Sequence, residues 1–135
     1  MSHTERDTEL NEQTCWERLH ANTLGRLVIA DGNTVEVLPV LYGISEEEIY
    51  VRTTRGERFS SVVVSRHVAF EIDELLFDGI RSVIVQGIAH WLPPEMTPRL
   101  VEKFDNRTTD SHTQWVQIIP RSIKGREYSL IPAQH

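Results

Sequence analysis

Apolar and polar residues alternate with a period of two in several short segments of this chain, and turn residues separate these segments. In 67–73, for example, Val68, Phe70 and Ile72 fall on one face. Successive side chains of a β-strand point to opposite faces, so this alternation predicts strands with one buried face. The same pattern, or a short apolar run, predicts further strands at 24–30, 34–44, 49–53, 81–92, 112–119 and 123–131.

Six or seven strands joined mostly by short turns favour a small closed antiparallel barrel, because closure removes the unpaired edges of a sheet. Asp31-Gly32-Asn33 is typical of a hairpin turn. Proline cannot donate to a strand ladder, so Pro39 predicts an edge or a bulge in its strand. Gly87 predicts a bulge or a bend in the longest strand.

Helical patterns are confined to short segments, which we expect to plug the open ends of the barrel. In 11–22, Cys15, Trp16 and Leu19 fall on one side. The segment 57–66 is ambiguous, because its three successive valines would also suit a strand; we favour a helix. A third short helix is predicted at 98–104.

Composition limits the class of protein. The length of 135 residues fits a single domain, 1–135, with a flexible polar tail at 1–9. The net charge of −6 disfavours nucleic-acid binding, which uses a basic surface, and so disfavours an oligonucleotide-binding barrel. The apolar runs are too short to span a bilayer, and the polar start does not resemble a secretory signal. We therefore expect a cytoplasmic protein without a membrane partner.

No local motif for catalysis or metal binding is present, and we predict no metal site. Cys15 is the only cysteine, and we expect it to be a small buried apolar residue rather than a nucleophile. The histidines are not spaced like a metal pair on a helix. The sequence therefore identifies no catalytic residue.

One basic segment stands out against the acidic background. Residues 52–66 contain four arginines and one glutamate, a net charge of 4 − 1 = +3. A strand, a glycine turn and a helix N-terminus would bring backbone amides, the hydroxyls of Thr53 and Thr54, and guanidinium groups close together. These groups are typical of a phosphate site. The alternative is that the arginines pair with surface acids such as Glu46, Glu47 and Glu48.

Four blocks in this order resemble the flavin-nucleotide-binding split-barrel family related to pyridoxamine 5′-phosphate oxidase. They are GRLVIADGNTVEVLPVLYGI, VRTTRGERF, VAFEID and SVIVQGIA, and the resemblance extends from about Cys15 to Arg126. It implies a mainly β fold, a six-stranded antiparallel Greek-key split barrel, in a homodimer whose two FMN sites lie at the interface.

The resemblance also implies cofactor-binding residues. Arg52, Thr53, Gly56 and Arg58 would hold the FMN phosphate, with Thr54 in the same loop. Pro39 and Val40 would run beside the isoalloxazine ring, and Gln86 would approach the cofactor. The chain differs from the family pattern at Glu57, Leu41, Ile80 and Arg81.

Two functions follow from this resemblance. The first is a flavin-dependent oxidoreductase that acts on an unknown small molecule, with the cofactor supplying the redox chemistry. The alternative is a non-catalytic module of the same fold that binds a flavin, a deazaflavin or haem.

Overall fold

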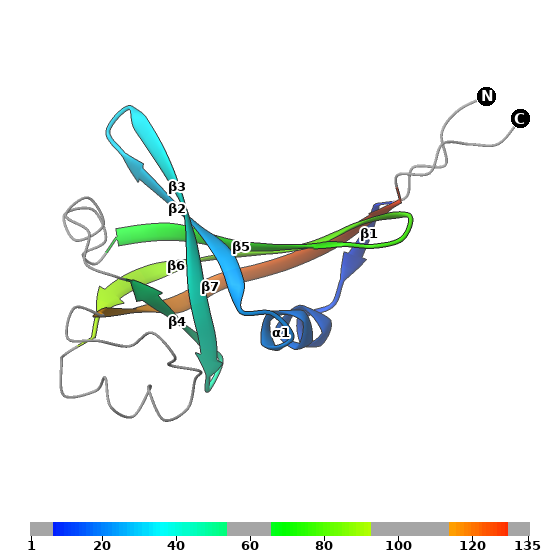
Figure 1. The fold of residues 1–135 in the computed structure, drawn as a ribbon, viewed down its shortest axis with the longest axis horizontal. Coiled ribbons are helices and arrows are strands. Elements are labelled where there is room, and N and C mark those ends of the chain that lie inside the picture. The colour runs from blue at the N-terminus through cyan, green and yellow to red at the C-terminus, as the bar shows by residue number, and fades with distance from the viewer. Residues whose placement is uncertain (1–6, 54–65, 93–113, 130–135) are drawn as a thin grey trace, which may run out of the picture.

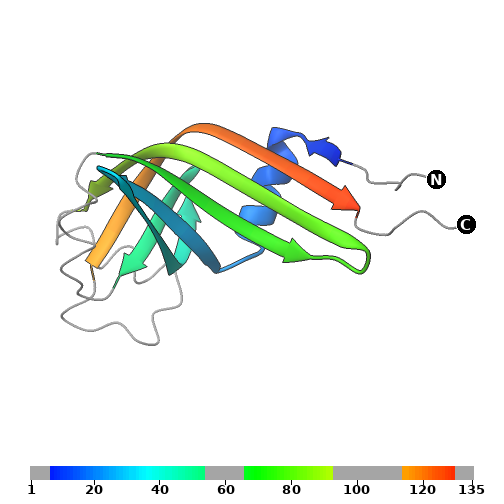
Figure 2. The ribbon, with the colours of Figure 1, turned by 90° about the horizontal axis from the view of Figure 1, so that it is seen from above.

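A computed structural model of the protein describes residues 7–53, 66–92 and 114–129. Their elements, in chain order, are β1 (Asp7–Leu10), α1 (Glu12–His20), β2 (Leu24–Asp31), β3 (Thr34–Ser45), β4 (Glu48–Thr53), β5 (Arg66–Leu75), β6 (Gly79–Trp91) and β7 (Gln114–Ser129). Figures 1 and 2 show β5, β6 and β7 as long curved strands that run side by side. None of the helices in these ranges is long and apolar enough to cross a membrane.

The strands form a closed barrel. Their order is β7-β4-β3-β2-β5-β6, and β6 pairs back onto β7, so six antiparallel strands close on themselves. Strand β1 adds a seventh strand to β7. The chain passes from β4, which pairs with β7, to β5, which pairs with β2, and this crossing fits a Greek key. The predicted six-stranded antiparallel barrel is confirmed.

The predicted helix at 11–22 is confirmed as α1. The side chain of Asn11 accepts a hydrogen bond from the Thr14 amide at 2.8 Å, which caps the first turn. The other two predicted helices, 57–66 and 98–104, lie outside the described residues, except that Arg66 begins β5.

Two expectations about chain segments are wrong. Residues 7–9 are not part of a flexible tail, because β1 pairs with 125–128 and the Arg126 guanidinium donates to Asp7 at 3.0 Å. The two strands expected at 112–119 and 123–131 are one continuous strand over the described residues, β7. A register shift opposite Gln86 and Gly87 leaves Arg121 as an extra residue, so β7 bends without breaking.

Local chemistry explains these bends and turns. A Cβ added to Gly87 would lie 2.4 Å from the Ile119 carbonyl oxygen, so only glycine permits this approach of β6 to β7. Gly32 has a φ of 62°, as the β2–β3 hairpin turn requires. The region of β3 around Pro39 pairs only with β2 among the described strands, so the predicted edge position of this proline is confirmed.

The core fills the inside of the barrel, and α1 covers one opening. Strand residues with their side chains inward are almost fully buried; examples are Leu27, Ile29, Val51, Phe70, Val83, Val85, Val116 and Ile118. Cys15, Trp16 and Leu19 of α1 pack against the same cluster. The Tyr42 hydroxyl donates to the Leu19 carbonyl at 2.6 Å, and burial raises the pKa of this hydroxyl.

Glu74 ties the helix to the β5–β6 hairpin. Its carboxylate accepts from Arg18 Nη2 at 2.6 Å, from Asn22 Nδ2 at 2.8 Å and from Arg81 Nε at 2.8 Å. The hydrogen bonds from Arg18 are the largest cause that lowers the pKa of Glu74 to about 2, and those from Asn22 and Arg81 add to the shift. Burial acts in the opposite direction.

This pKa predicts an acid-sensitive fold. A folded pKa of about 2 against an ordinary 4.5 means that the stabilisation is complete above about pH 5 and is lost as the pH falls toward 2. We expect Glu74→Gln to lower the free energy of unfolding at pH 7 by about 2–3 kcal/mol. The variant should also lose less stability than the wild type between pH 5 and pH 3. Urea unfolding at these pH values measures both effects.

Glu17→Gln, on the exposed side of α1, is the matched control and should behave like the wild type. If Glu74→Gln lost as much free energy of unfolding between pH 5 and pH 3 as the wild type does, carboxylates other than Glu74 would be the cause of the acid sensitivity.

Candidate functional site

The outward face of β2 and β3 exposes a row of apolar side chains. Leu24 pairs with Leu41 and Val28 with Val37, and cross-strand partners project from the same face. Leu24 is 61%, Val37 54% and Leu41 43% exposed. We call the surface formed by Leu24, Val28, Val35, Val37, Pro39 and Leu41 the apolar strip. An exposed apolar row on one face is typical of a binding surface.

Arg52 lies at one end of the apolar strip. It stands in β4 between Leu41 of β3 and Trp115 of β7, and its side chain is half-buried. On the same face of the β4–β7 pair, Tyr50 and Trp115 are buried against each other and against Leu92. A guanidinium group between aliphatic and aromatic side chains suits a ligand that has both a planar ring and an anionic group.

Of the other residues predicted to hold a phosphate, the structure places only the backbone of Thr53. It ends β4, next to Arg52, and pairs with Gln114. Thr54, Gly56 and Arg58 lie outside the described residues. Of the basic segment 52–66, the structure therefore describes only Arg52 and Thr53 at the end of β4 and Arg66 at the start of β5.

Pro39 and Val40 lie near Arg52 but point to opposite faces of β3. Pro39 is exposed and belongs to the apolar strip. The Val40 side chain is only 7% exposed and packs in the core. A ligand on the outer face could therefore contact the Pro39 ring, whereas Val40 offers it only backbone atoms.

Gln86 is not brought together with these residues. It is exposed on the outer face of β6, and two strands, β2 and β5, stand between β6 and β3. Its neighbours are the residues of a shallow cleft on β6 and β7: Ser82, Ile84, Ser122, Lys124, Arg126 and Tyr128. Three strand spacings, about 14 Å along the sheet, separate Gln86 from β3.

Sequence reasoning missed Arg26, which stands directly opposite Pro39. Arg26 Nη2 donates to Glu71 Oε1 at 2.9 Å and also to Asp73. Burial, followed by the hydrogen bond with Asp73, raises the pKa of Glu71. The sequence did contain a pattern for this cluster. Arg26 in the strand 24–30, and Glu71 and Asp73 in the strand 67–73, all fall on the outward face of their strands, so pairing of these two strands would bring them together.

Cys15 is fully buried, and desolvation is the main cause that raises the pKa of its thiol. A buried thiol with a raised pKa does not act as a nucleophile, so the structure agrees with the interpretation as a small core residue. Across 7–53, 66–92 and 114–129, no group of three or more His, Cys, Asp or Glu residues is arranged to hold a metal ion.

The closed six-stranded barrel and the helix that packs against its core define a split-barrel fold, and its outer face carries the apolar strip that ends at Arg52. A model of the family described as pyridoxamine 5′-phosphate oxidase matches residues 11–127. The chain belongs to this family.

Solved structures agree with this assignment. A putative pyridoxamine 5′-phosphate oxidase from Corynebacterium glutamicum is 28% identical, with a TM-score of 0.79 over 93% of this chain and 100% of the other. The FAD binding protein from Mycobacterium smegmatis is 28% identical, with a TM-score of 0.73 over 90% of this chain and 98% of the other. An FAD-binding protein from Mesorhizobium loti, 23% identical with a TM-score of 0.77 over 93% and 98% of the two chains, shares the fold. No curated protein matches the sequence significantly.

Proposed function

We propose that this protein binds a flavin nucleotide on the outer face of β3 and β4. The observation that carries the proposal is the apolar strip with Arg52 at its end. An isoalloxazine ring needs a flat apolar surface, and its phosphate needs a cation at one end of that surface. The family and the FAD binding protein from Mycobacterium smegmatis support a flavin as the ligand.

In this proposal Arg52 holds the phosphate, together with Thr53, Thr54, Gly56 and Arg58 of the basic segment. Pro39 and Leu41 contact the ring, and Val40 contributes backbone atoms only. Leu41 fits this position because its side chain is exposed beside Arg52. Gln86 contacts the same cofactor only if the cofactor extends around the barrel to β6 or if a second subunit brings Gln86 to it.

The preferred flavin is FMN, and the proposed function is that of an oxidoreductase acting on a small molecule. Bound flavin would supply the electron transfer, so the protein need only bind and orient the two reactants. The outer face is consistent with such a role. The charged groups next to Pro39 are already paired, because Arg26 forms ion pairs with Glu71 and Asp73, and they are not needed as an acid or a base. The alternative is a module that binds flavin, deazaflavin or haem without turnover.

We also propose a homodimer. Ile84, 43% exposed, stands on the same outer face as the apolar strip, because Arg26 pairs with Glu71 and Glu71 with Ile84. Apolar side chains on the outer face of β2, β3 and β6 favour burial against another copy. The cofactor would then lie between two subunits.

Flavin binding predicts a loss of affinity in Arg52→Ala. We expect the variant to bind FMN about 10- to 150-fold more weakly, because a charge-assisted hydrogen bond contributes about 1.5–3 kcal/mol. Quenching of flavin fluorescence during titration measures the affinity, and titrations with FAD, a deazaflavin and haem rank the ligands. Arg121→Ala, on β7 away from the apolar strip, should bind like the wild type. Equal affinities in both variants would place the phosphate elsewhere.

The proposed oxidoreductase activity has its own test. The protein loaded with FMN should be reduced by a nicotinamide donor and reoxidised by an electron acceptor over many cycles, followed by flavin absorbance at about 450 nm. Free FMN at the same concentration is the control. Tight binding with no more turnover than free FMN would favour the non-catalytic module.

The dimer predicts that a charge on the apolar strip separates the subunits. Val37→Lys should sediment as a monomer at concentrations where the wild type is a dimer, because the lysine would be buried without a partner. Phe77→Lys replaces an even more exposed apolar residue, in the β5–β6 turn, and should leave the dimer intact. A monomeric wild type would refute this proposal.

A further inference from the structure

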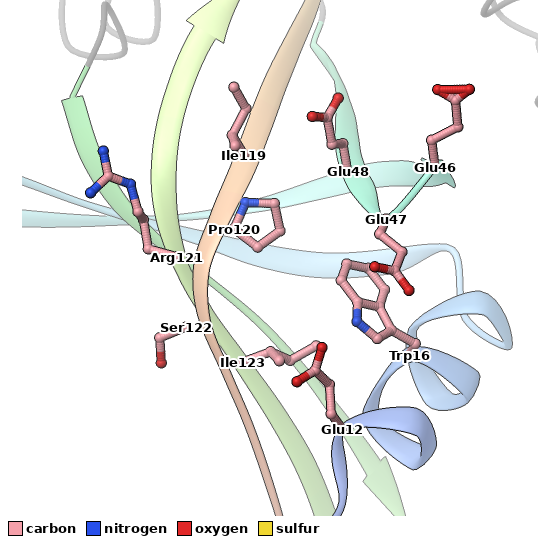
Figure 3. A pocket seen from close by; sticks show the side chains of 10 residues that line it. All are labelled: Glu12, Trp16, Glu46, Glu47, Glu48, Ile119, Pro120, Arg121, Ser122 and Ile123. Atoms are coloured by element: carbon pink, nitrogen blue, oxygen red, sulfur yellow. The ribbon is translucent and has the colours of Figure 1, made fainter.

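A cleft of about 570 Å³ lies where the barrel is split along β7. The pairing of β7 with β4 ends at Ile118, and its pairing with β1 begins at Gly125. Between these points β7 has β6 on one side and no described strand on the other. Figure 3 shows this stretch of β7 facing α1 and the β3–β4 turn, which form the other walls. The topology itself therefore makes the cleft.

Carboxylates stand at two ends of this cleft. Glu12 comes from the first turn of α1, Glu46 and Glu47 form the β3–β4 turn, and Glu48 begins β4. Glu48 accepts from Gln117 Nε2 at 2.6 Å and from the Tyr50 hydroxyl at 3.2 Å. Within the described ranges, Glu12, Glu46 and Glu47 form no salt bridge. The sole basic side chain of the lining, Arg121, is exposed, and Figure 3 shows its guanidinium turned away from the carboxylates.

Trp16 lies between the two acidic ends and supplies an independent sign of a ligand. Its side chain lines the cleft and is only 9% exposed. Its indole Nε1 is buried and has no hydrogen-bond partner. Figure 3 shows the nitrogen edge of the ring turned toward Glu12 and Ile123, on the cleft side. A buried donor without an acceptor is unfavourable, and an acceptor on a bound molecule would satisfy it.

We propose that this cleft binds a small aliphatic diamine that carries an oxygen acceptor between its two ammonium groups. One ammonium group pairs with Glu12 and the other with Glu46 and Glu47. The carbon chain lies against the Trp16 ring and Ile123, and the oxygen accepts from Trp16 Nε1. An aromatic wall also favours an ammonium group directly.

Two other occupants fit less well. A metal ion would need several ligands around one point, and no such group of three exists in the parts of the chain that the structure describes. An added β-strand would need a regular row of amides along β7. Pro120 lacks an amide hydrogen, and the extra residue Arg121 breaks the register, which are two devices that protect strand edges from pairing.

The cleft is distinct from the proposed flavin surface. Along the β3–β4 ladder, Arg52 pairs with Leu41 at one end, whereas Ser45 pairs with Glu48 at the other. Glu48 and Arg52 are four residue steps apart along β4, about 13 Å. The amine site can therefore be tested without a flavin and does not depend on the proposed function.

The test is calorimetric titration of the full chain with 1,3-diamino-2-propanol at fixed ionic strength. We expect saturable binding of one molecule per chain. Binding should weaken about tenfold or more in Glu46→Gln/Glu47→Gln and in Glu12→Gln, the low end for loss of a charge-assisted hydrogen bond. Glu17→Gln, also on α1 but outside the cleft, should change the affinity less than about twofold.

The matched amines isolate each part of the proposal. 1,3-Diaminopropane, which lacks the oxygen, and 1-amino-2-propanol, which lacks one charge, should both bind more weakly. In Trp16→Phe the preference for the hydroxylated diamine should disappear.

Three results would overturn the proposal. The first is the absence of saturable binding of 1,3-diamino-2-propanol. The second is a loss of affinity in Glu17→Gln as large as that in the cleft variants. The third is competition by Mg²⁺ for the site as effective as competition by the amine. Because the glutamine variants alter exposed side chains, they keep the test decisive even if Trp16→Phe does not fold. If a folded Trp16→Phe variant still bound 1,3-diamino-2-propanol more tightly than 1,3-diaminopropane, Trp16 Nε1 would not be the donor to the ligand oxygen.

Discussion

The ladder between β6 and β7 is the constraint on which the rest of the structure depends. It converts an open sheet into a barrel, because β7 pairs with β4 on one side and with β6 on the other. The ladder can close only if β7 bends, and the register shift at Arg121, with Gly87 opposite, allows that bend. Closure then fixes which side chains point inward and which form the outer face.

Closure also produces the two surfaces on which we propose ligand binding. The outer face carries the apolar strip beside Arg52, because residues paired across β2, β3 and β4 project together. The split along β7 arises because β4 and β1 pair with different stretches of the same long strand. Glu74 then fixes α1 against the β5–β6 hairpin, and α1 supplies Trp16 to the wall of that split.

Much of the fold could be predicted because its signals are local. Val68, Phe70 and Ile72 are all buried on one side of β5, as their period of two indicated. Pro39 lies on an unpaired edge because it has no amide hydrogen to donate. The expected break between the last two strands was wrong because a bulge, which depends on the partner strand, carries β7 past Pro120. Asp7 to Glu9 looked like a tail for the same reason, since only pairing with β7 orders them.

For the candidate sites, too, some features follow from the local sequence and others depend on the tertiary structure. The sequence by itself determined that the chain forms short strands with one apolar face, because backbone sterics and the alternation of side chains act residue by residue. Its resemblance to a family predicted Arg52 and Pro39 as cofactor-binding residues. Only the tertiary structure decided that Val40 points into the core, that Gln86 stands on another part of the barrel, and that Glu12, Trp16 and Glu47 line one cleft. These facts depend on strand register and barrel closure, which bring together residues far apart in the chain and so leave no local pattern.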